Sequence, residues 1–233
     1  MRAHLDAPPS TKSTVSALLW ATLAGALLVP SAGHAQNCPL PTVPSGSGEG
    51  TIRIDGRQDE ASWGASVPLS EFRMVEPNEG APATFTTRVR ILADPTALYI
   101  GIEAFDDDPD GIVSYSKARD AQLRSEGHIK ILLDPFLDGQ SGFVFAVNPA
   151  GARYDALVAD QGLGENASWD AVWEARTTVT DSGWTAELRI PIQSLTFSSG
   201  AETWGFNVER RVQRLLEVSR WASPSRLAPL TQT

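Results

Sequence analysis

The sequence is poor in cysteine, histidine and basic residues. Its one cysteine, Cys38, has no partner for an internal disulfide, so the fold must rest on its core. The 19 Lys and Arg residues stand against 28 Asp and Glu residues, which gives a formal net charge of −9 at pH 7. Since an acidic surface repels phosphate backbones, we expect no nucleic-acid partner, and anionic lipid is disfavoured for the same reason. Neutral partners and divalent cations remain open.

Motifs of common enzyme classes are also missing. The sequence contains no G-x-S-x-G nucleophile motif and no H-E-x-x-H zinc motif. A glycosidase needs two carboxylates about 5–9.5 Å apart across a cleft, and nothing in the sequence pairs two acidic residues in this way. We therefore favour a binding protein over an enzyme. If the chain is part of an enzyme, the expected class is a hydrolase of O-glycosyl bonds.

The N-terminus predicts export. Arg2 and Lys12 precede an apolar run, VSALLWATLAGALLV (15–29), and the small-residue pattern GHA (33–35) follows. This is the order of a secretory signal peptide, and the run is shorter than the roughly 20 residues that span a bilayer. We expect cleavage after residue 35, the alternative being an uncleaved N-terminal anchor. Residues 36–50, rich in Pro, Gly and Ser, are typical of an extended linker.

From residue 51 to about residue 200, short runs of alternating apolar residues are separated by turn residues. In each run the apolar side chains share one face: Thr87, Val89 and Ile91; Leu98, Ile100, Ile102 and Ala104; Ile129, Ile131 and Leu133; Phe143, Phe145 and Val147; Ala175, Thr177 and Val179; Trp184, Ala186, Leu188 and Ile190. The pattern predicts an all-β fold, an antiparallel β-sandwich of immunoglobulin-like or jelly-roll-like type. Residues 201–233 contain one further strand pattern, WGFNV, and we expect them to begin a separate, truncated C-terminal domain.

Five segments occur in an order that resembles one family. They are IDGRQDEASW (54–63), ALYIGIEAFDDDPD (97–110), HIKILLDPFLD (128–138), VNPAG (147–151) and GWTAELRIPIQSL (183–195). Together they are similar to the carbohydrate-binding module family 9-like domains. The tail, WGFNVERRVQR and EVSRW, is similar to proteins in which such a domain precedes an outer-membrane β-barrel domain of unknown function.

The resemblance implies a non-catalytic carbohydrate-binding module in the periplasm, outer membrane or cell surface of a Gram-negative bacterium. Its partner would be a saccharide or polysaccharide, and modules of this kind are often linked to polysaccharide catabolism. The alternative is a structural, plug-like periplasmic domain that serves its own C-terminal barrel domain and has no sugar site. A haem-binding redox sandwich is a minor alternative, for which Met74 and His128 are the available axial ligands after export.

Tryptophans can fill a core or stack on the apolar face of a sugar ring. We expect Trp63 to plug one end of the sandwich, and Trp173, in phase with Ala175, to be buried. Trp169 follows the polar stretch GENAS (164–168), where no core awaits it, and is the first choice for a sugar platform. With Arg119, whose planar fork could donate to adjacent hydroxyls, Trp169 and Trp173 form the predicted carbohydrate-binding set. The alternative for Arg119 is a surface ion pair with Asp120.

An acidic stretch offers a metal site. Clustered carboxylates repel one another, and a hard cation such as Ca²⁺ would relieve that repulsion. The spacing is not that of an EF-hand loop, and a solvated turn is the alternative. The predicted calcium ligands are Asp106, Asp107, Asp108 and Asp110.

Overall fold

The computed structural model describes residues 46–47, 52–159, 164–201, 203–228 and 230–231. The expected signal peptide, residues 1–35, lies outside these ranges. Of the expected linker, residues 36–50, the description covers only Gly46–Ser47, which form the short strand β1. In the described ranges we find no helix with the length and apolar character to cross a membrane.

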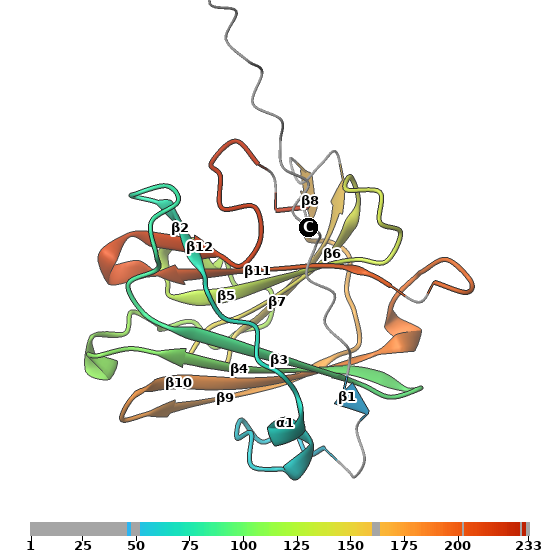
Figure 1. Cartoon of the computed structure of the whole chain (residues 1–233), viewed down its shortest axis with the longest axis horizontal. Helices are drawn as coiled ribbons and strands as arrows, with labels where there is room; N and C mark the ends of the chain where they lie inside the picture. The colour runs from blue at the N-terminus through green and yellow to red at the C-terminus, as the bar shows by residue number, and fades with distance from the viewer. Residues whose placement is uncertain (1–45, 48–51, 160–163, 202, 229, 232–233) are drawn as a thin grey trace, which may run out of the picture. The chain divides into compact units, whose positions relative to one another are not determined.

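The described residues form two sheets that face each other across one core (Figure 1). The five-stranded sheet has the order β1-β3-β4-β10-β9. Its strands after β1 are β3 (Thr87–Ala93), β4 (Ala97–Phe105), β9 (Glu174–Thr180) and β10 (Gly183–Pro191). All its pairings are antiparallel except the parallel pair β1–β3.

The seven-stranded sheet has the order β2-β12-β11-β5-β6-β7-β8 and is antiparallel throughout. Its strands are β2 (Arg73–Glu76), β5 (His128–Asp134), β6 (Gly142–Val147), β7 (Arg153–Ala159), β8 (Gly164–Asn166), β11 (Gly205–Val212) and β12 (Glu217–Arg220). One short helix, α1 (Ala61–Ala65), and four 3₁₀ turns, η1 (Pro109–Gly111), η2 (Leu123–Ser125), η4 (Ile192–Ser194) and η5 (Gln213–Leu215), lie between described strands. The predicted all-β sandwich is confirmed.

The core lies between the sheets and follows the predicted alternation. Ile129, Ile131 and Leu133 of β5 face Ile100 and Ile102 of β4 within one buried cluster. Such alternation is what a strand with one face on the core requires. One expected position is wrong: Val179 is 53% exposed. It lies near the end of β9, which is an edge strand and has a neighbour on one side only.

The outer face of the five-stranded sheet is covered by residues 52–66. Trp63 of α1 is 1% exposed, and its Nε1 donates to Glu187 at 3.0 Å. Gly101 of β4 makes the room, because a Cβ there would lie 3.0 Å from the Trp63 ring and 2.6 Å from Gln58 Oε1. Trp63 is therefore buried as expected, but on the outside of a sheet rather than at an end of the sandwich.

The seven-stranded sheet continues past the expected domain boundary at residue 200. β11 lies between β12 and β5 in the seven-stranded sheet, and its Val208 is fully buried in the central core. The segment after β12 is also attached, because the side-chain amide of Asn207 in β11 donates to the carbonyls of Ala222 and Leu230, both at 3.2 Å. The sandwich thus continues through these residues. Sequence alone missed this because the partners of β11 and β5 are over 70 residues apart, and local pattern carries no information on such pairing.

Candidate functional site

One side of the sandwich is closed by aromatic residues. The segment 167–173 leaves β8 in one sheet and enters β9 in the other, and it contributes Trp169 and Trp173. The Trp169 ring lies 5.0 Å from that of Phe143, and the Trp173 ring lies 5.1 Å from that of Phe145 in an edge-to-face arrangement. We call these four residues the aromatic edge. Tilted and edge-to-face contacts of this kind are the preferred geometry of aromatic pairs.

A buried carboxylate fastens this edge to β7. Asp155 faces inward and is 0% exposed. It accepts hydrogen bonds from Trp173 Nε1 at 2.9 Å, from the Ala171 amide at 2.7 Å and from Arg119 Nη2 at 2.9 Å. A buried carboxylate is stable only when it is paired and hydrogen-bonded. Asp155 therefore fixes the crossing segment and the loop of Arg119 at the same place.

Arg119 connects the buried carboxylate to the surface. Its Nη2 also donates to the Ala171 carbonyl at 2.9 Å and contacts the Asp170 carboxylate. Its side chain is 30% exposed, whereas that of Asp170 is 73% exposed. Arg119 does form the expected ion pair with Asp120, at 3.7 Å, but the contact with Asp155 is shorter. The arrangement therefore presents a partly exposed arginine side chain beside an exposed carboxylate.

The two tryptophans differ in what they offer a ligand. Trp173 is 3% exposed, as expected from its phase, so it supports the edge from within and presents almost no surface. Trp169 is partly buried and packs against the core. The expectation that no core awaits Trp169 is wrong, because Phe143 and Phe145 hold one part of its ring. Trp169 is intermediate in exposure, and its role in sugar binding stays a prediction.

Sequence reasoning missed the residues that organise this edge. The missed residues are Asp155, which pairs with Phe145 in the sheet, Phe143, which pairs with Leu133, and Asp170, which directly follows Trp169. A signal for Asp155 did exist, since an acidic residue in the core-facing phase of an apolar strand needs a buried partner. Its pairing with Arg119, 36 residues away, left no such trace in the sequence.

The four aspartates predicted to bind calcium are not brought together as ligands. Asp106 is buried and holds Arg214 by two hydrogen bonds of 2.9 and 2.6 Å. Arg214 also lies 3.1 Å from Asp107 and 3.8 Å from Asp108, so its guanidinium supplies the positive charge that a cation would provide. Asp110 takes no part in these contacts. In the described part of the chain, no group of three or more His, Cys, Asp or Glu side chains is placed to hold a metal ion.

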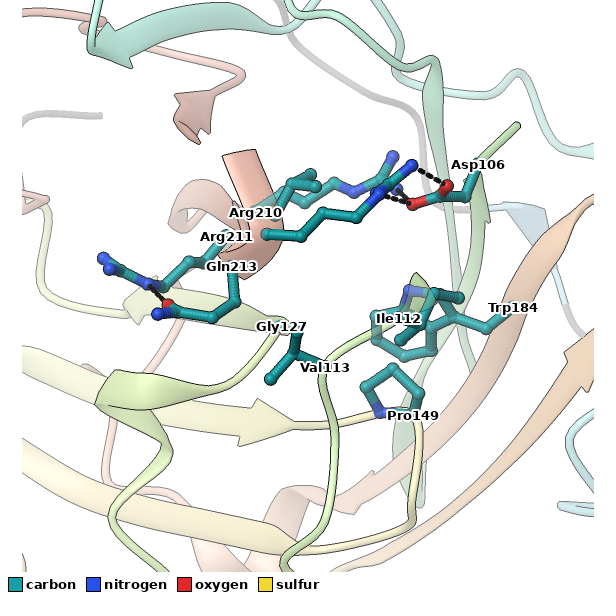
Figure 2. Close-up of a pocket in the computed structure, with 11 residues that line it drawn as sticks. Asp106, Ile112, Val113, Gly127, Pro149, Trp184, Arg210, Arg211 and Gln213 are labelled. Atoms are coloured by element: carbon teal, nitrogen blue, oxygen red, sulfur yellow. Dashed lines mark hydrogen bonds and ion pairs between the residues drawn. The ribbon is translucent and has the colours of Figure 1, made fainter. Parts of the chain in front are cut away.

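A second arginine completes what we call the arginine end, formed by Asp106, Arg210 and Arg214. Arg210 is 2% exposed and donates to the Thr86 carbonyl, to Thr87 Oγ1 and to the Phe105 carbonyl. Burial lowers the pKa of its guanidinium to about 10. Figure 2 shows Arg210 reaching toward Asp106, whereas Arg211 and Gln213 contact each other farther away, and Trp184 and Pro149 lie on another side of the pocket. The cavity between them is ≈ 20 Å³, room for one water rather than an organic ligand.

The structure does not bring Met74 and His128 together. Met74 is in β2 and His128 in β5, and the strands β12 and β11 lie between them in the same sheet. Side chains of one sheet stand roughly perpendicular to it, so these two do not point at each other from opposite sides of one iron. The geometry required by the haem alternative is therefore absent.

Comparison with known proteins finds similarity at the level of the fold. No protein-family model matches the chain, and no curated protein matches it. A carbohydrate binding module of family 9 from Caldicellulosiruptor kristjanssonii in complex with cellotriose matches with a TM-score of 0.48 and 16% identity, over 73% of this chain and 78% of the module. The structure of such a module from the same organism with glucose gives 0.48 and 16%, over 76% and 88%.

A third structure comes from Bacteroides uniformis and is described as a candidate carbohydrate-binding protein. It matches with a TM-score of 0.50 and 11% identity, over 69% of this chain and 83% of that chain. The two proteins share the β-sandwich fold. A shared fold does not carry function with it, so the function has to be argued from the site.

Proposed function

We propose that the protein binds a saccharide without catalysis, and that the aromatic edge is its binding site. The main observation behind the proposal is that the partly buried ring of Trp169 packs against Phe143. The next residue, Asp170, contacts Arg119. The motifs that resemble the family 9-like modules and the sandwich shared with the Bacteroides uniformis protein support the same function.

The chemistry of this edge suits a sugar. A pyranose has an apolar C–H face that stacks on an indole and hydroxyl groups that both donate and accept hydrogen bonds. Arg119 supplies planar donors and Asp170 an exposed acceptor, close to the indole of Trp169. Because Asp155 accepts two hydrogen bonds from the crossing segment and a third from Arg119, the platform is rigid before a ligand arrives. Preorganisation of this kind lowers the entropic cost of binding.

The proposal is tested by glycan-array screening of residues 36–231, followed by calorimetric titration with the best ligand. Trp169→Ala should weaken binding at least several-fold, because stacking contributes about 1 kcal/mol beyond area burial. Val172→Ala is a matched control, since Val172 is 78% exposed in the same segment and has no aromatic face. It should bind as the wild type does.

Two outcomes would contradict the proposal. If the wild type binds no glycan, the structural-domain alternative takes its place. If a glycan binds and Trp169→Ala retains full affinity while remaining folded, the sugar site lies elsewhere on the molecule.

We further propose that the chain is exported to the periplasm, outer membrane or cell surface. Residues 15–29 and the GHA pattern at 33–35 support this proposal, as argued from the sequence. N-terminal sequencing of the envelope fraction should begin at Gln36. Envelope protein that begins at Met1 would instead indicate an uncleaved anchor.

A further inference from the structure

A polar hollow opens on the outer face of the seven-stranded sheet. Lys130 of β5, Ala146 of β6 and Tyr154 of β7 lie side by side in register, and each alternates with a core-facing neighbour. The small Ala146 lies between two longer side chains and lines the floor of the hollow. Gln122, Arg124, His128 and Glu165 complete the wall. Its residues are distinct from those of the aromatic edge.

Three of the lining groups already bind one another. Glu165 accepts hydrogen bonds from Lys130 Nζ at 2.8 Å and from the Tyr154 hydroxyl at 2.9 Å. Burial raises the pKa of Tyr154, so its hydroxyl keeps the proton it donates. Although burial opposes ionisation of Glu165, Lys130 holds the pKa of Glu165 below its ordinary value. This chain of bonds fixes the shape of the hollow and leaves two N–H groups of Lys130 available.

Three other groups that line the hollow have hydrogen-bonding capacity that the described residues do not use: His128 Nε2 and the side chains of Gln122 and Arg124. His128 Nδ1 donates to the Glu126 carbonyl at 3.0 Å, which leaves Nε2 as the second ring nitrogen. Burial lowers the pKa of His128, so the imidazole is neutral and Nε2 is an acceptor. Among the described residues we find no hydrogen bond to this Nε2, and none from the side chains of Gln122 or Arg124. Both Gln122 and Arg124 are exposed at the mouth of the hollow.

The charges select the ligand class. Among the residues that line the hollow, Arg124 and Lys130 carry two positive charges and Glu165 one negative charge, on a chain whose net charge is −9. A carboxylate matches the free N–H groups of Arg124 and Lys130. His128 Nε2 requires a donor, which a hydroxyl group supplies. A ligand that carries both groups is a hydroxycarboxylate.

We propose that the hollow binds an acidic sugar, with the carboxylate of a uronic acid residue on Arg124 and Lys130 and a ring hydroxyl on His128 Nε2. One water needs about 10–15 Å³ of such space, so the cavity of ≈ 40 Å³ has room for a carboxylate group, and it is twice the size of the cavity at the arginine end. The sugar ring itself lies across the mouth. The site is separate from the aromatic edge, so this inference does not depend on the function proposed there.

The test is a titration followed by two-dimensional NMR with sodium glucuronate, glucose and sodium acetate. Glucuronate should shift the backbone resonances of Lys130, Ala146 and Tyr154 in a saturable manner, whereas glucose and acetate should not. Arg124→Gln should weaken glucuronate binding about tenfold, the usual effect of one charge-assisted hydrogen bond. Lys117→Gln removes an equal charge from an exposed position outside the hollow and should bind as the wild type does.

The inference is overturned if glucuronate causes no saturable shifts, or if Lys117→Gln and Arg124→Gln weaken binding equally. Equal binding of acetate would reduce the hollow to a simple anion site, and equal binding of glucose would remove the role of the carboxylate. Trp169→Ala provides the separation from the proposed function: it should leave glucuronate binding unchanged even where it abolishes binding of a neutral sugar.

Discussion

The aromatic edge and the arginine end are built around the same pair of residue types but expose them differently. Each holds a buried aspartate against an arginine: Asp155 with Arg119, and Asp106 with Arg214. The Arg119 side chain is 30% exposed and reaches Asp170 at the surface. At the arginine end, Arg210 adds a guanidinium that is almost fully buried and spends its donors on backbone carbonyls.

The difference in exposure between these arginines separates those that stabilise the fold from those that can contact a ligand. An arginine whose donors all reach buried acceptors fixes the fold, and its removal leaves those acceptors unsatisfied. An arginine that is anchored at one N–H and open at others can present a fixed geometry to a ligand. We therefore expect substitutions at the arginine end to act on stability, and surface substitutions at the aromatic edge to act on binding.

The largest effect should come from Trp173→Ala. The change removes a buried indole, its contact with Phe145 and its hydrogen bond to Asp155, and a buried Trp→Ala change costs about 3–5 kcal/mol. Trp173→Phe retains much of the volume and should cost less. Urea denaturation of both variants measures the difference. Near-wild-type stability of Trp173→Ala would show that the stability of the fold does not depend on the buried Trp173 side chain.

Arg210→Met should lower the free energy of unfolding by about 3 kcal/mol. The methionine keeps the apolar stem but removes the donors to Thr87 Oγ1 and to the Phe105 carbonyl, and each unsatisfied buried acceptor costs about 1–3 kcal/mol. Lys117→Met is the control at an exposed site. If the free energy of unfolding falls no more than in the control, the buried guanidinium makes no net contribution to stability. Some buried ion pairs behave in this way.

A smaller effect is expected from Glu126, next to Gly127 of the arginine-end cavity. Burial opposes its ionisation, yet hydrogen bonds from Ser116, Tyr115 and Asn148 hold its pKa below the ordinary 4.5. A depressed pKa contributes stability that is complete above the ordinary value and is lost as pH falls through the folded-state pKa. Glu126→Gln should therefore cost stability at neutral pH and progressively less in acid.

Unfolding free energies of wild type and Glu126→Gln across the acid range give the measurement. A difference that stays constant with pH would assign the effect of the substitution to packing rather than to the charge.

The smallest effect concerns calcium. With Arg214 against Asp106, Asp107 and Asp108, we expect calcium to leave the melting temperature of the wild type unchanged. Arg214→Gln removes the competing charge, so calcium should raise the melting temperature of that variant by mass action. Thermal melts with calcium and with chelator compare the two. A calcium-dependent rise in the wild type would restore the calcium site predicted from the sequence.

How far the sequence predicted the fold depended on whether the signal was local. Alternation identified the core faces of β4, β5 and β10 because each strand buries one side of consecutive residues. Trp173 and Trp184 were assigned to the core by the same phase, correctly. Trp63 was correctly predicted to be buried, but its position on the outer face of the sheet was not predicted. The space above Gly101 that holds its ring forms only when residues 52–66 pack on β4.

The candidate sites were less predictable because they depend on pairings across the fold. Arg119 was chosen as a loop residue, but its contact with Asp155 arises from a backbone bridge to Arg153 that no local pattern encodes. The hollow around His128 was missed entirely. It requires Lys130, Ala146 and Tyr154 in register on three strands, and register is a property of the assembled sheet.

The strand lengths at the sheet margins bear on how the protein behaves at high concentration. Among the edge strands in the described part of the chain, β2 has four residues and β9 has seven. A free edge is a template for strand addition by another copy, and short edges offer little of it. β9 is the long one, and it carries exposed Glu174 and Arg176. Charges on an edge discourage edge-to-edge aggregation, so these two residues oppose strand addition at β9 by another copy of the chain.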